Sequence, residues 1–465
     1  MTAPQTLSAR MAEFVSATTF DDIPDAVLHD ARNHVLDALG SALGSSAMNF
    51  GDAVHTAAQR LGSGQEAHAV GYGTALPAPS AALVNGTLIH GFDFDDTHVG
   101  AVYHATAPAL AGALAAAEEA GASGRRLLLG YVLGMEIGCR IAEAGAGRFH
   151  ARGFHPTGIA GTFAAACAAA SIRGVAPETV RNALGLCGSQ AGGLLEIRNS
   201  WLKRVHPGWA AHSGLIALTL AESGFSGPVT VFEGTKGLFA THLGFVPDAA
   251  GLGLDTLGER WMTAETAYKP YPCCHFTHAF ADAAFQVLDE LGVATVRAAD
   301  VTRIVCPTSP GVMPEVTEPA AVKIAPATTY DAMFSVQYAV ASVLVRGRLD
   351  LATFYDDPLD DPEVLAVARL VECPPDPDSD YPARFPGEVR LHLGDGREIT
   401  RRVTASRGTP GNRFTDEDVM AKFLGNATRR TSREQAETVA RTVRGLGVES
   451  DVDSLVMSLD AEVRR

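Results

Sequence analysis

The chain has 465 residues, of which 46% are hydrophobic and 19% are charged, and its formal net charge at pH 7 is −16. A chain of this length exceeds one ordinary core, so we expect two or three domains with large apolar interiors. The negative charge argues against nucleic acid or an anionic membrane as a partner, because both require a concentrated basic face. An acidic protein can still bind acidic ligands if its few basic groups are gathered in one cleft.

The cysteines and the apolar stretches bear on the protein's location. The seven cysteines are odd in number and lack paired ligand spacing, and they stand at positions 139, 167, 187, 273, 274, 306 and 373. No signal peptide pattern precedes the polar N-terminal segment. The longest apolar stretches, 105–117 and 159–170, are rich in Ala and Gly and shorter than the roughly 20 residues of a membrane span. We therefore expect a cytoplasmic protein in which both stretches are interior helices.

Helical signals dominate from the N-terminus to about residue 258. Pro at or near the start of a segment and Gly just past its end recur, which is typical of helix boundaries. No strand pattern interrupts these segments, so we expect an all-helical domain over 1–267. The expected helices span 25–43, 80–91, 108–121, 124–144, 157–173, 177–188 and 207–224.

The pattern changes after about residue 267. Segments 301–307 and 387–393 read as strands, and Asp395-Gly396 supplies a turn into 398–403, which indicates a β-hairpin. With an expected helix over 331–346, these segments predict a smaller α+β domain over 268–405. A stretch rich in Pro and Asp at 356–382 is expected to be connecting surface structure. After residue 415 the apolar residues have helical spacing. The C-terminal helices in 406–465 should complete the helical domain, giving a mainly α protein.

Four histidines stand just before segments that begin like helices: His104, His155, His206 and His275. The first turn of a helix carries unpaired N–H groups and the positive end of the helix dipole, so it attracts carboxylates. Lys203 and Arg204 precede His206, and Lys269 precedes His275, which adds fixed positive charge. Such groups can hold a di- or tricarboxylate and stabilise the enolate-like charge formed when its α-proton leaves. The alternative is that each histidine caps a helix or satisfies a buried polar group.

Segment 90–98, HGFDFDDTH, places three carboxylates between an apolar helix and the loop that leads to His104. These are Asp93, Asp95 and Asp96. Asp and His are good ligands for divalent metals, but no HExxH or comparable ligand spacing is present, so we expect no metal. A metal-dependent lyase that uses the three aspartates is the alternative. Otherwise the acids orient catalytic His and Lys residues, or one of them is a base with a shifted pKa.

Motifs for the common cofactors are missing from the sequence. Cys273 and Cys274 are adjacent in KPYPCCH, and adjacent cysteines alone cannot hold an iron–sulfur cluster. They are expected to pack at the start of a helix, with a reactive thiol near Lys269 and His275 as the alternative. The chain has no GxGxxG after a strand, no GxxxxGK[ST] and no GxSxG, so nucleotide-dependent and α/β-hydrolase chemistry lack support. We therefore expect no cofactor.

Five sequence blocks resemble, in this order, the signature blocks of the MmgE/PrpD family. They are HGFDFDDTH, GFHPTGIAGTFAAA, KRVHPGWAAHSG, KPYPCCHFTHAFADAA and AMFSVQYAVA, and the resemblance runs from about residue 5 to about residue 425. The family includes 2-methylcitrate dehydratase, cis-aconitate decarboxylase and iminodisuccinate epimerase. The resemblance implies a large helical domain, a smaller α+β lid, a cofactor-free site between them and a homodimer.

The resemblance also implies a set of site residues. The expected catalytic residues are Asp93, His104, His155, Lys203, Lys269 and His275. The expected substrate-binding residues are Thr97 and Tyr103 from the resemblance, and Arg204 and His206 from the basic helix entrance described above. In the decarboxylases one residue fewer separates the Thr of DFDDT from the following His. Tyr103 therefore competes with His104 for that family position.

The chemistry implied by the family is removal of a proton next to a carboxylate, with cations holding the charge that develops. Loss of a β-hydroxyl makes the enzyme a dehydratase, and protonation of the carbanion left by CO₂ makes it a decarboxylase. We expect such a lyase, with a methylcitrate- or aconitate-like polycarboxylate as substrate. One alternative is an epimerase of an iminodisuccinate-like polycarboxylate, because the KRxHPG and KPYPxC forms depart from typical 2-methylcitrate dehydratases. The other is a carboxylate-binding protein without turnover.

Overall fold

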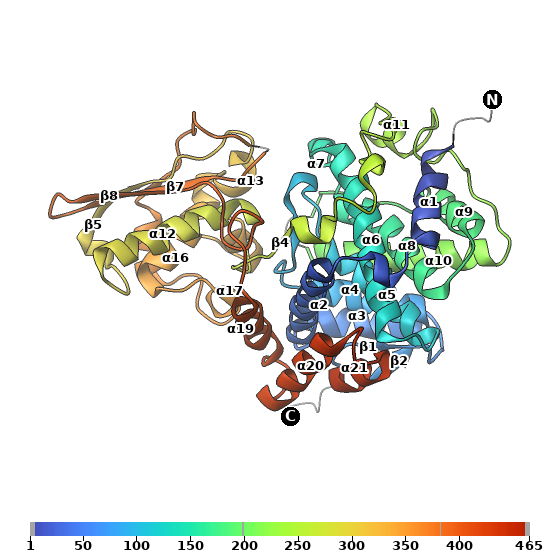
Figure 1. Ribbon diagram of the computed structural model, residues 1–465. Coiled ribbons are helices and arrows are strands. Elements are labelled where there is room, and N and C mark those ends of the chain that lie inside the picture. The colour runs from blue at the N-terminus through green and yellow to red at the C-terminus, as the bar shows by residue number, and fades with distance from the viewer. Residues whose placement is uncertain (1–4, 198–199, 382, 461–465) are drawn as a thin grey trace. The chain divides into compact units, whose positions relative to one another are not determined.

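Helices account for most of the residues that the computed structural model describes, which are 5–197, 200–381 and 383–460 (Figure 1). The chain divides into two units, of which unit 1 comprises Met1–Ala267 with Thr415–Arg465 and unit 2 comprises Tyr268–Phe414. Unit 1 is helical apart from two short strand pairs, and unit 2 combines a four-stranded sheet with helices. The expected fold class, mainly α with a smaller α+β part, is confirmed. None of the described helices has the length and apolar character of a membrane span.

The core of unit 1 is a group of Ala- and Gly-rich helices that approach one another closely. Helix α8 packs against α5, α6 and α10, and its residues from Pro156 to Ala170 are all buried. A Cβ added at Gly112 of α5 would lie 2.8 Å from the Ala165 Cβ of α8, so the small side chains set the spacing of these backbones. The longer helices of this part are α1 (Leu7–Ala17), α2 (Asp25–Ser45), α3 (Asn49–Arg60), α4 (Ala78–Ile89), α5 (Thr106–Glu119), α6 (Gly124–Gly145), α8 (Pro156–Arg173), α9 (Pro177–Cys187) and α10 (Leu202–Glu222).

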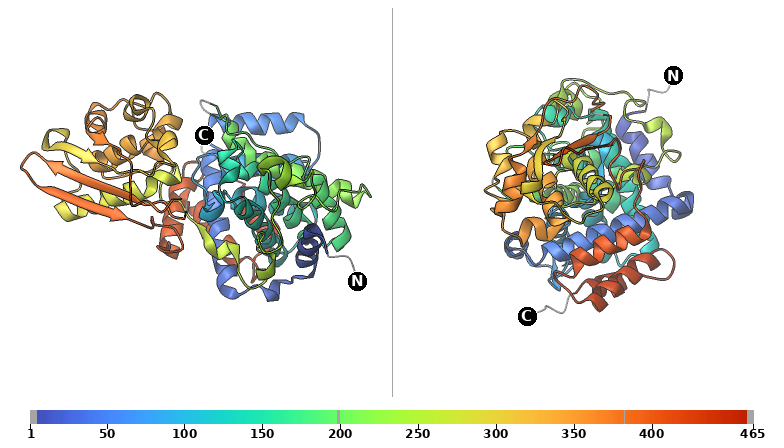
Figure 2. Two further views of the ribbon diagram at one scale, coloured as in Figure 1. Left: turned by 90° about the horizontal axis from the view of Figure 1, so that it is seen from above. Right: turned by 90° about the vertical axis from the view of Figure 1, so that its left-hand side faces the viewer.

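The C-terminal segment from Thr415 belongs to unit 1. It forms α19 (Asp416–Ala427), α20 (Arg433–Gly445) and α21 (Val452–Leu459). Helix α19 packs along α2, and Figure 2 shows the red C-terminal helices beside the blue helix. Residues more than 300 positions apart in the sequence are therefore neighbours in this unit.

Two strand pairs interrupt unit 1, so the expectation that 1–267 contains helices alone was wrong. Strand β1 (Ala67–Ala69) pairs with β2 (Thr74–Leu76), and β3 (Thr97–His98) pairs with β4 (Thr266–Ala267), both antiparallel. Strands of two or three residues are too short to show the period of two by which a strand is recognised. The β3–β4 pair anchors the end of the HGFDFDDTH segment.

Helix α10 also differs from its prediction, because it begins at Leu202 and contains Pro207 instead of starting there. The reason is tertiary packing. A Cβ at Gly86 of α4 would lie 2.7 Å from the Gly208 Cα, so α10 is held tightly against α4 next to the proline. Such contacts override local propensity. His206 therefore lies inside the helix, and the expectation that it precedes the first turn was wrong.

Unit 2 contains a sheet with strand order β6-β5-β7-β8, in which β7 is antiparallel to β5 and β8, and β5 is parallel to β6. The strands are β5 (Val301–Val305), β6 (Val371–Glu372), β7 (Gly387–Leu393) and β8 (Glu398–Val403). The predicted hairpin is confirmed, with Gly396 at a φ of 91° in its turn. Helix α12 (His278–Leu291) packs against β7, β8 and α16 (Val336–Arg346).

Two expectations for unit 2 were wrong. The expected helix over 331–346 is divided into α15 (Thr329–Met333) and α16, because the Ser335 side chain accepts a hydrogen bond from the Tyr338 N–H and starts a new helix. The stretch 356–382 contains α18 (Pro362–Ala368) as well as β6. Asp361 caps α18 and Pro362 occupies its first position, so this Asp-Pro pair starts a helix instead of a turn.

Candidate functional site

The loop between α4 and α5 carries most of the predicted site residues and has an unusual backbone. Asp93 has a φ of 52° and Val102 a φ of 49°, two of three non-glycine residues with positive φ among the described residues. This region is unfavourable for residues with a Cβ, most of all for a β-branched one such as Val102. Backbone strain of this kind persists only where the surrounding structure holds it, and it concentrates at functional sites.

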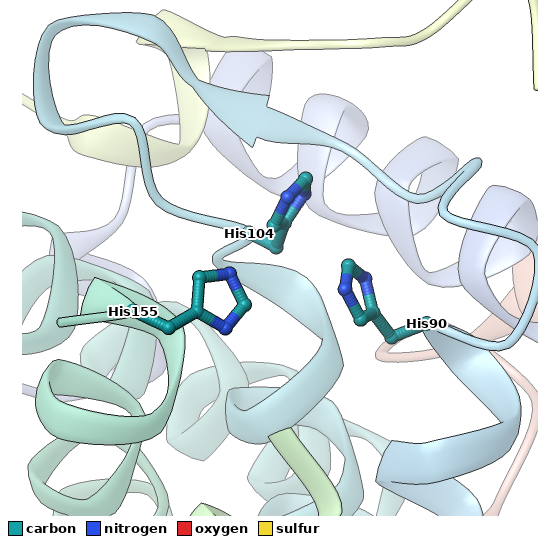
Figure 3. A group of neighbouring side chains, drawn as sticks. All are labelled: His90, His104 and His155. Carbon is teal, nitrogen blue, oxygen red and sulfur yellow. The ribbon is translucent and has the colours of Figure 1, made fainter. Parts of the chain in front are cut away.

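Three buried histidines come together beside this loop, and Figure 3 shows their rings facing one another. His90 follows the last residue of α4, His104 precedes α5, and His155 is the N-cap residue of α8. The ring centroid of His104 lies 4.4 Å from that of His90 and 5.9 Å from that of His155. We call His90, His104 and His155 the histidine cluster. His104 and His155 were expected to stand just before helices and do so.

The two acids nearest to the cluster have different roles. Asp95 Oδ1 accepts a hydrogen bond from His90 Nδ1 at 2.7 Å, and both side chains are fully buried. Asp93 forms an ion pair with Lys203, which lies in the first turn of α10, and its Oδ1 is 3.7 Å from His104 Nε2. Asp95 thus orients an imidazole, whereas Asp93 holds a lysine beside the cluster.

Asp96 belongs to the supporting structure. Its carboxylate contacts the ring of His34 at 2.8 Å and accepts hydrogen bonds from the backbone N–H and the hydroxyl of Thr106, the first residue of α5. Burial alone would raise the pKa of Asp96, but the contacts with His34 and Thr106 outweigh burial and lower that pKa. Asp96 is therefore an ionised helix cap. The alternative that groups Asp93, Asp95 and Asp96 as ligands of one metal is not supported by this placement.

Lys203, His206 and Arg204 reach the site from α10. His206 Nδ1 lies 2.9 Å from His155 Nδ1, so one of these rings donates its N–H to the other. Arg204 donates a hydrogen bond from Nε to the Gly91 carbonyl at 2.7 Å and lies over the Phe50 ring. Arg204 therefore holds the loop backbone, and its expected contact with the substrate stays a prediction.

His155 and His206 are held in their neutral form. Burial and the charge of Lys203, followed by neighbouring imidazoles, lower the pKa of His155 well below its usual value. Burial, His90 and Lys203 lower the pKa of His206 to about 4. A neutral imidazole has one nitrogen that accepts a proton and one that donates, which suits both proton transfer and hydrogen bonding at pH 7.

The side chains of Tyr103 and His104, which compete for one family position, have different surroundings. The Tyr103 side chain is fully buried against α6, where a Cβ added at Gly138 would lie 2.6 Å from the Tyr103 hydroxyl. The ring of His104 instead faces His90, and its Nδ1 lies 3.1 Å from the Asp96 carbonyl and 3.3 Å from the Thr97 hydroxyl. Of the two competing residues, His104 lies in the histidine cluster and Tyr103 packs in the core.

Lys269 and His275 are the predicted site residues that belong to unit 2. The Lys269 side chain is buried, and His275 starts the short 3₁₀ turn His275–Thr277 that precedes α12. The His275 ring stacks on His278 with centroids 4.8 Å apart. Cys273 is buried with its Sγ 3.1 Å from the Thr277 hydroxyl, which agrees with the expected packing role.

Two residues that position the site, His90 and Lys422, were missed from the sequence, whereas Asp95 was among the acids expected to orient a histidine or a lysine. His90 and Asp95 stood within the HGFDFDDTH motif, and their separation of five residues was the available signal. Lys422 of α19 gave no signal at all. It donates a hydrogen bond to the Phe94 carbonyl at 2.7 Å and forms an ion pair with Asp37 of α2 at 2.8 Å. A buried lysine of the C-terminal helix α19 thus holds in place the loop that carries Asp93 and Asp95.

Three groups of side chains could hold a metal ion within the described parts of the chain. The histidine cluster is one, and His90 with Asp93, Asp95 and His104 forms an overlapping second. The third consists of His98, Glu143 and Glu265. The guanidinium of Arg260 bridges the two glutamates of the third group at 2.9 and 2.6 Å, so this group already has a cation.

Comparisons with known proteins bear on the family of the chain. The profile of the MmgE/PrpD N-terminal domain matches residues 9–247, and that of the MmgE/PrpD C-terminal domain matches residues 271–446. The chain is 26% identical to a cis-aconitate decarboxylase-like protein of Aspergillus oryzae over 98% of both chains. It is also 26% identical to cis-aconitate decarboxylase of Aspergillus terreus, over 98% of this chain and 96% of that one. With cis-aconitate decarboxylase of Homo sapiens it shares 28% identity, over 91% of this chain and 88% of the human one.

Proposed function

The chain belongs to the MmgE/PrpD family, and we propose that it is a cofactor-independent lyase that acts on a small di- or tricarboxylate. The observation that carries this proposal is the pair of buried, neutral imidazoles of His155 and His206 beside the Lys203–Asp93 pair. The names of relatives that match nearly the whole chain favour a substrate similar to cis-aconitate. Decarboxylation is therefore our first choice of reaction and dehydration the second.

Lys203 is the group that binds a substrate carboxylate in this proposal. An incoming carboxylate replaces Asp93 as its partner, and the ammonium then stabilises the charge that develops on the substrate. In a decarboxylation the C–C bond to the departing carboxylate breaks, and its electron pair stays on the carbon framework as CO₂ leaves. The cation nearby lowers the energy of that carbanion, and a proton then forms the new C–H bond.

His155 is our candidate for the proton transfer. Its low pKa means that the protonated ring returns its proton readily, and the hydrogen bond with His206 lets the second imidazole share the charge. His104 faces the same cluster and is the second candidate. In a dehydration the neutral ring removes the proton next to the carboxylate, and the β-hydroxyl leaves with a proton as water.

The remaining predicted residues have assigned parts in the proposal. Lys269 and His275, which belong to unit 2, stay predicted catalytic residues on the family resemblance alone. Thr97 binds the substrate or orients His104, which its hydroxyl contacts at 3.3 Å. Tyr103 is not part of the proposed site, because its ring packs against α6.

The test is to incubate the protein, freed of metals by EDTA, with a panel of polycarboxylates in D₂O and to follow products by NMR. Loss of CO₂ or water with deuterium at one carbon supports the lyase and identifies its substrate. Deuterium exchange with an unchanged carbon skeleton and inverted configuration would show an epimerase instead. Binding without exchange or turnover would show a carboxylate-binding protein. Activity that is lost in EDTA and restored only by a divalent ion would contradict cofactor independence.

We also propose that the protein is a cytoplasmic homodimer. All seven cysteines are free thiols, which suits a reducing compartment. Trp201, Leu202 and Trp209 are 53%, 41% and 49% exposed around the start of α10, and large apolar groups gathered in this way mark an interaction surface. The mass in solution, measured by light scattering, tests this, and Trp209→Lys should shift the protein toward the monomer.

A further inference from the structure

The histidine cluster has the geometry of a metal-binding site. Each of the three rings has a nitrogen within 4.8 Å of a nitrogen of both others. The three side chains are 0%, 7% and 1% exposed, so water competes weakly for the space among them. Three imidazoles on separate helix ends are a common protein contribution to a site with one open position.

The hydrogen bonds around the rings supply a second, independent observation. A histidine that binds a metal typically donates its other N–H to a carboxylate or a carbonyl, which fixes the tautomer and aims the remaining lone pair at the ion. His90 Nδ1 donates to Asp95 at 2.7 Å, and His104 Nδ1 donates to the Asp96 carbonyl at 3.1 Å. The Nε2 atom of His90 is fully buried and has no hydrogen-bond partner among the described residues. At least this nitrogen presents an unused lone pair inside the cluster.

Charge and ligand type indicate which ion would bind. Asp95 orients His90, and Asp93 lies 3.7 Å from His104 Nε2, where it offers a fourth ligand. Asp95 and Asp93 bring negative charge toward a divalent ion, and Lys203 shares the charge of Asp93. Imidazole-rich sites favour zinc, copper, nickel and cobalt, whereas magnesium and calcium prefer oxygen ligands.

We propose that His90, His104 and His155 form a binding site for a divalent transition-metal ion of the zinc class. The ion uses the same nitrogens that the proposed lyase reaction needs, so it acts as an inhibitor that competes with proton transfer. This inhibitory effect rests on the proposed function, whereas the binding itself does not.

The experiment measures binding of Zn²⁺ to the full chain after EDTA treatment and desalting, by calorimetry and by competition with a fluorescent zinc chelator. Visible absorption of bound Co²⁺ reports the geometry independently of activity. We expect one ion per chain, a tetrahedral Co²⁺ spectrum and no comparable binding of Mg²⁺. His90→Gln and His155→Gln should each weaken Zn²⁺ binding at least tenfold.

Two further variants separate a site from a loss of folding. Asp95→Asn keeps the shape of the residue but replaces the carboxylate that orients His90 with a neutral amide, and should weaken Zn²⁺ binding roughly tenfold, the scale of lost outer-shell partners. His29→Gln is the matched control, because His29 also pairs with a carboxylate, Asp416, but does so on the surface. It should bind Zn²⁺ as the wild type does. Circular dichroism and thermal melting show that each variant is folded.

The proposal is overturned if His90→Gln and His155→Gln are folded and bind Zn²⁺ normally. It is overturned equally if binding is lost only in His98→Gln, because the ion would then use the His98, Glu143 and Glu265 group. Zn²⁺ that binds to the cluster without lowering turnover would overturn the inhibitory role. Turnover by the metal-free enzyme is measured separately from Zn²⁺ binding. Absence of turnover would contradict the proposed lyase function, whereas absence of Zn²⁺ binding would contradict the metal site.

Discussion

The Asp95 carboxylate lies 2.7 Å from His90 Nδ1, and neither side chain reaches solvent. The contact is a hydrogen bond from the His90 Nδ1–H to the carboxylate, the arrangement in which an acid orients a histidine for proton transfer. The consequence is that two residues of the motif, neither of them a predicted catalytic group, determine how the cluster presents its lone pairs.

Asp95→Asn should lower kcat by tenfold or more while KM and the melting temperature change little. The amide can present an N–H toward His90 and thereby favour the wrong tautomer, although its size is unchanged. Steady-state kinetics with the substrate found in D₂O tests this. A variant with normal kcat would show that His90 serves packing alone.

Lys203→Ala should lower kcat/KM more than tenfold, because a bound carboxylate loses its cation, at a cost on the order of 2–4 kcal/mol. The same change leaves Asp93 without its ion pair in a site where it is 9% exposed, so stability should fall as well. Adding Asp93→Asn to Lys203→Ala should recover stability but not turnover. Lys236→Ala, an exposed lysine before α11 (Leu238–Leu243), is the control and should behave as the wild type. Normal kinetics in Lys203→Ala would place the carboxylate elsewhere.

Lys269→Ala is expected to cost more than tenfold in kcat/KM for the same reason, with a separate effect on stability because the side chain is buried. Lys269→Met keeps most of the buried volume and removes only the charge. If the methionine variant is folded and retains normal kinetics, Lys269 is a structural residue of unit 2.

A helix or strand was predictable where its hydrophobic periodicity and its boundary residues indicated the same element. The segment 124–144 is a helix within one residue of its expected bounds, and β7 and β8 match theirs, because periodicity and boundary residues agreed. The start of α10 and the pairing of β3 with β4 were not predictable. The first depends on the contact between Gly86 and Gly208, and the second on residues about 170 positions apart.

The site was predictable to the same extent. Asp93 and His104 are close in sequence, and His155 carried a helix-start signal, so a motif-based reading found them. The pairing of His155 with His206 needed the arrangement of α8 and α10. Lys422 reaches the Phe94 carbonyl across 328 positions, so only the folded structure reveals it.

Lys422→Met should destabilise the protein by about 3–5 kcal/mol, because it leaves the buried Asp37 carboxylate unpaired. Burial already raises the pKa of Asp37, so the variant should recover stability as the pH is lowered and this acid becomes neutral. Urea unfolding at pH 7 and pH 5 measures both effects. Lys422→Met with Asp37→Leu should be more stable than Lys422→Met alone. Equal stability of the two would mean that the ion pair is not the source of the loss.

Stability should also fall in acid because of the site itself. The pKa of His206 is about 4 in the folded chain, against about 6.5 for an ordinary histidine. Between these values the unfolded chain binds a proton that the folded chain does not, so the free energy of unfolding decreases as the pH falls through this window. The contribution is complete above pH 6.5, and roughly 1–3 kcal/mol should be lost by pH 4. His206→Asn should show a shallower pH dependence in urea unfolding, and an unchanged slope would contradict the assignment.

The last prediction concerns His155, which caps α8 ahead of Pro156. Pro156 suits the first helical position, and the buried face of α8 holds the ring rigidly within the cluster. His155→Gln keeps a side chain of similar reach that can still hydrogen-bond to His206, but it cannot exchange a proton near neutral pH. We expect the fold and carboxylate binding to be retained and turnover to fall by roughly 10²-fold or more, the usual scale for a general acid or base. Calorimetric binding of the substrate, together with kcat, separates the two effects. If His155→Gln turns over normally, or is inactive only because it is unfolded, then His155 is a structural cap and proton transfer belongs to His104.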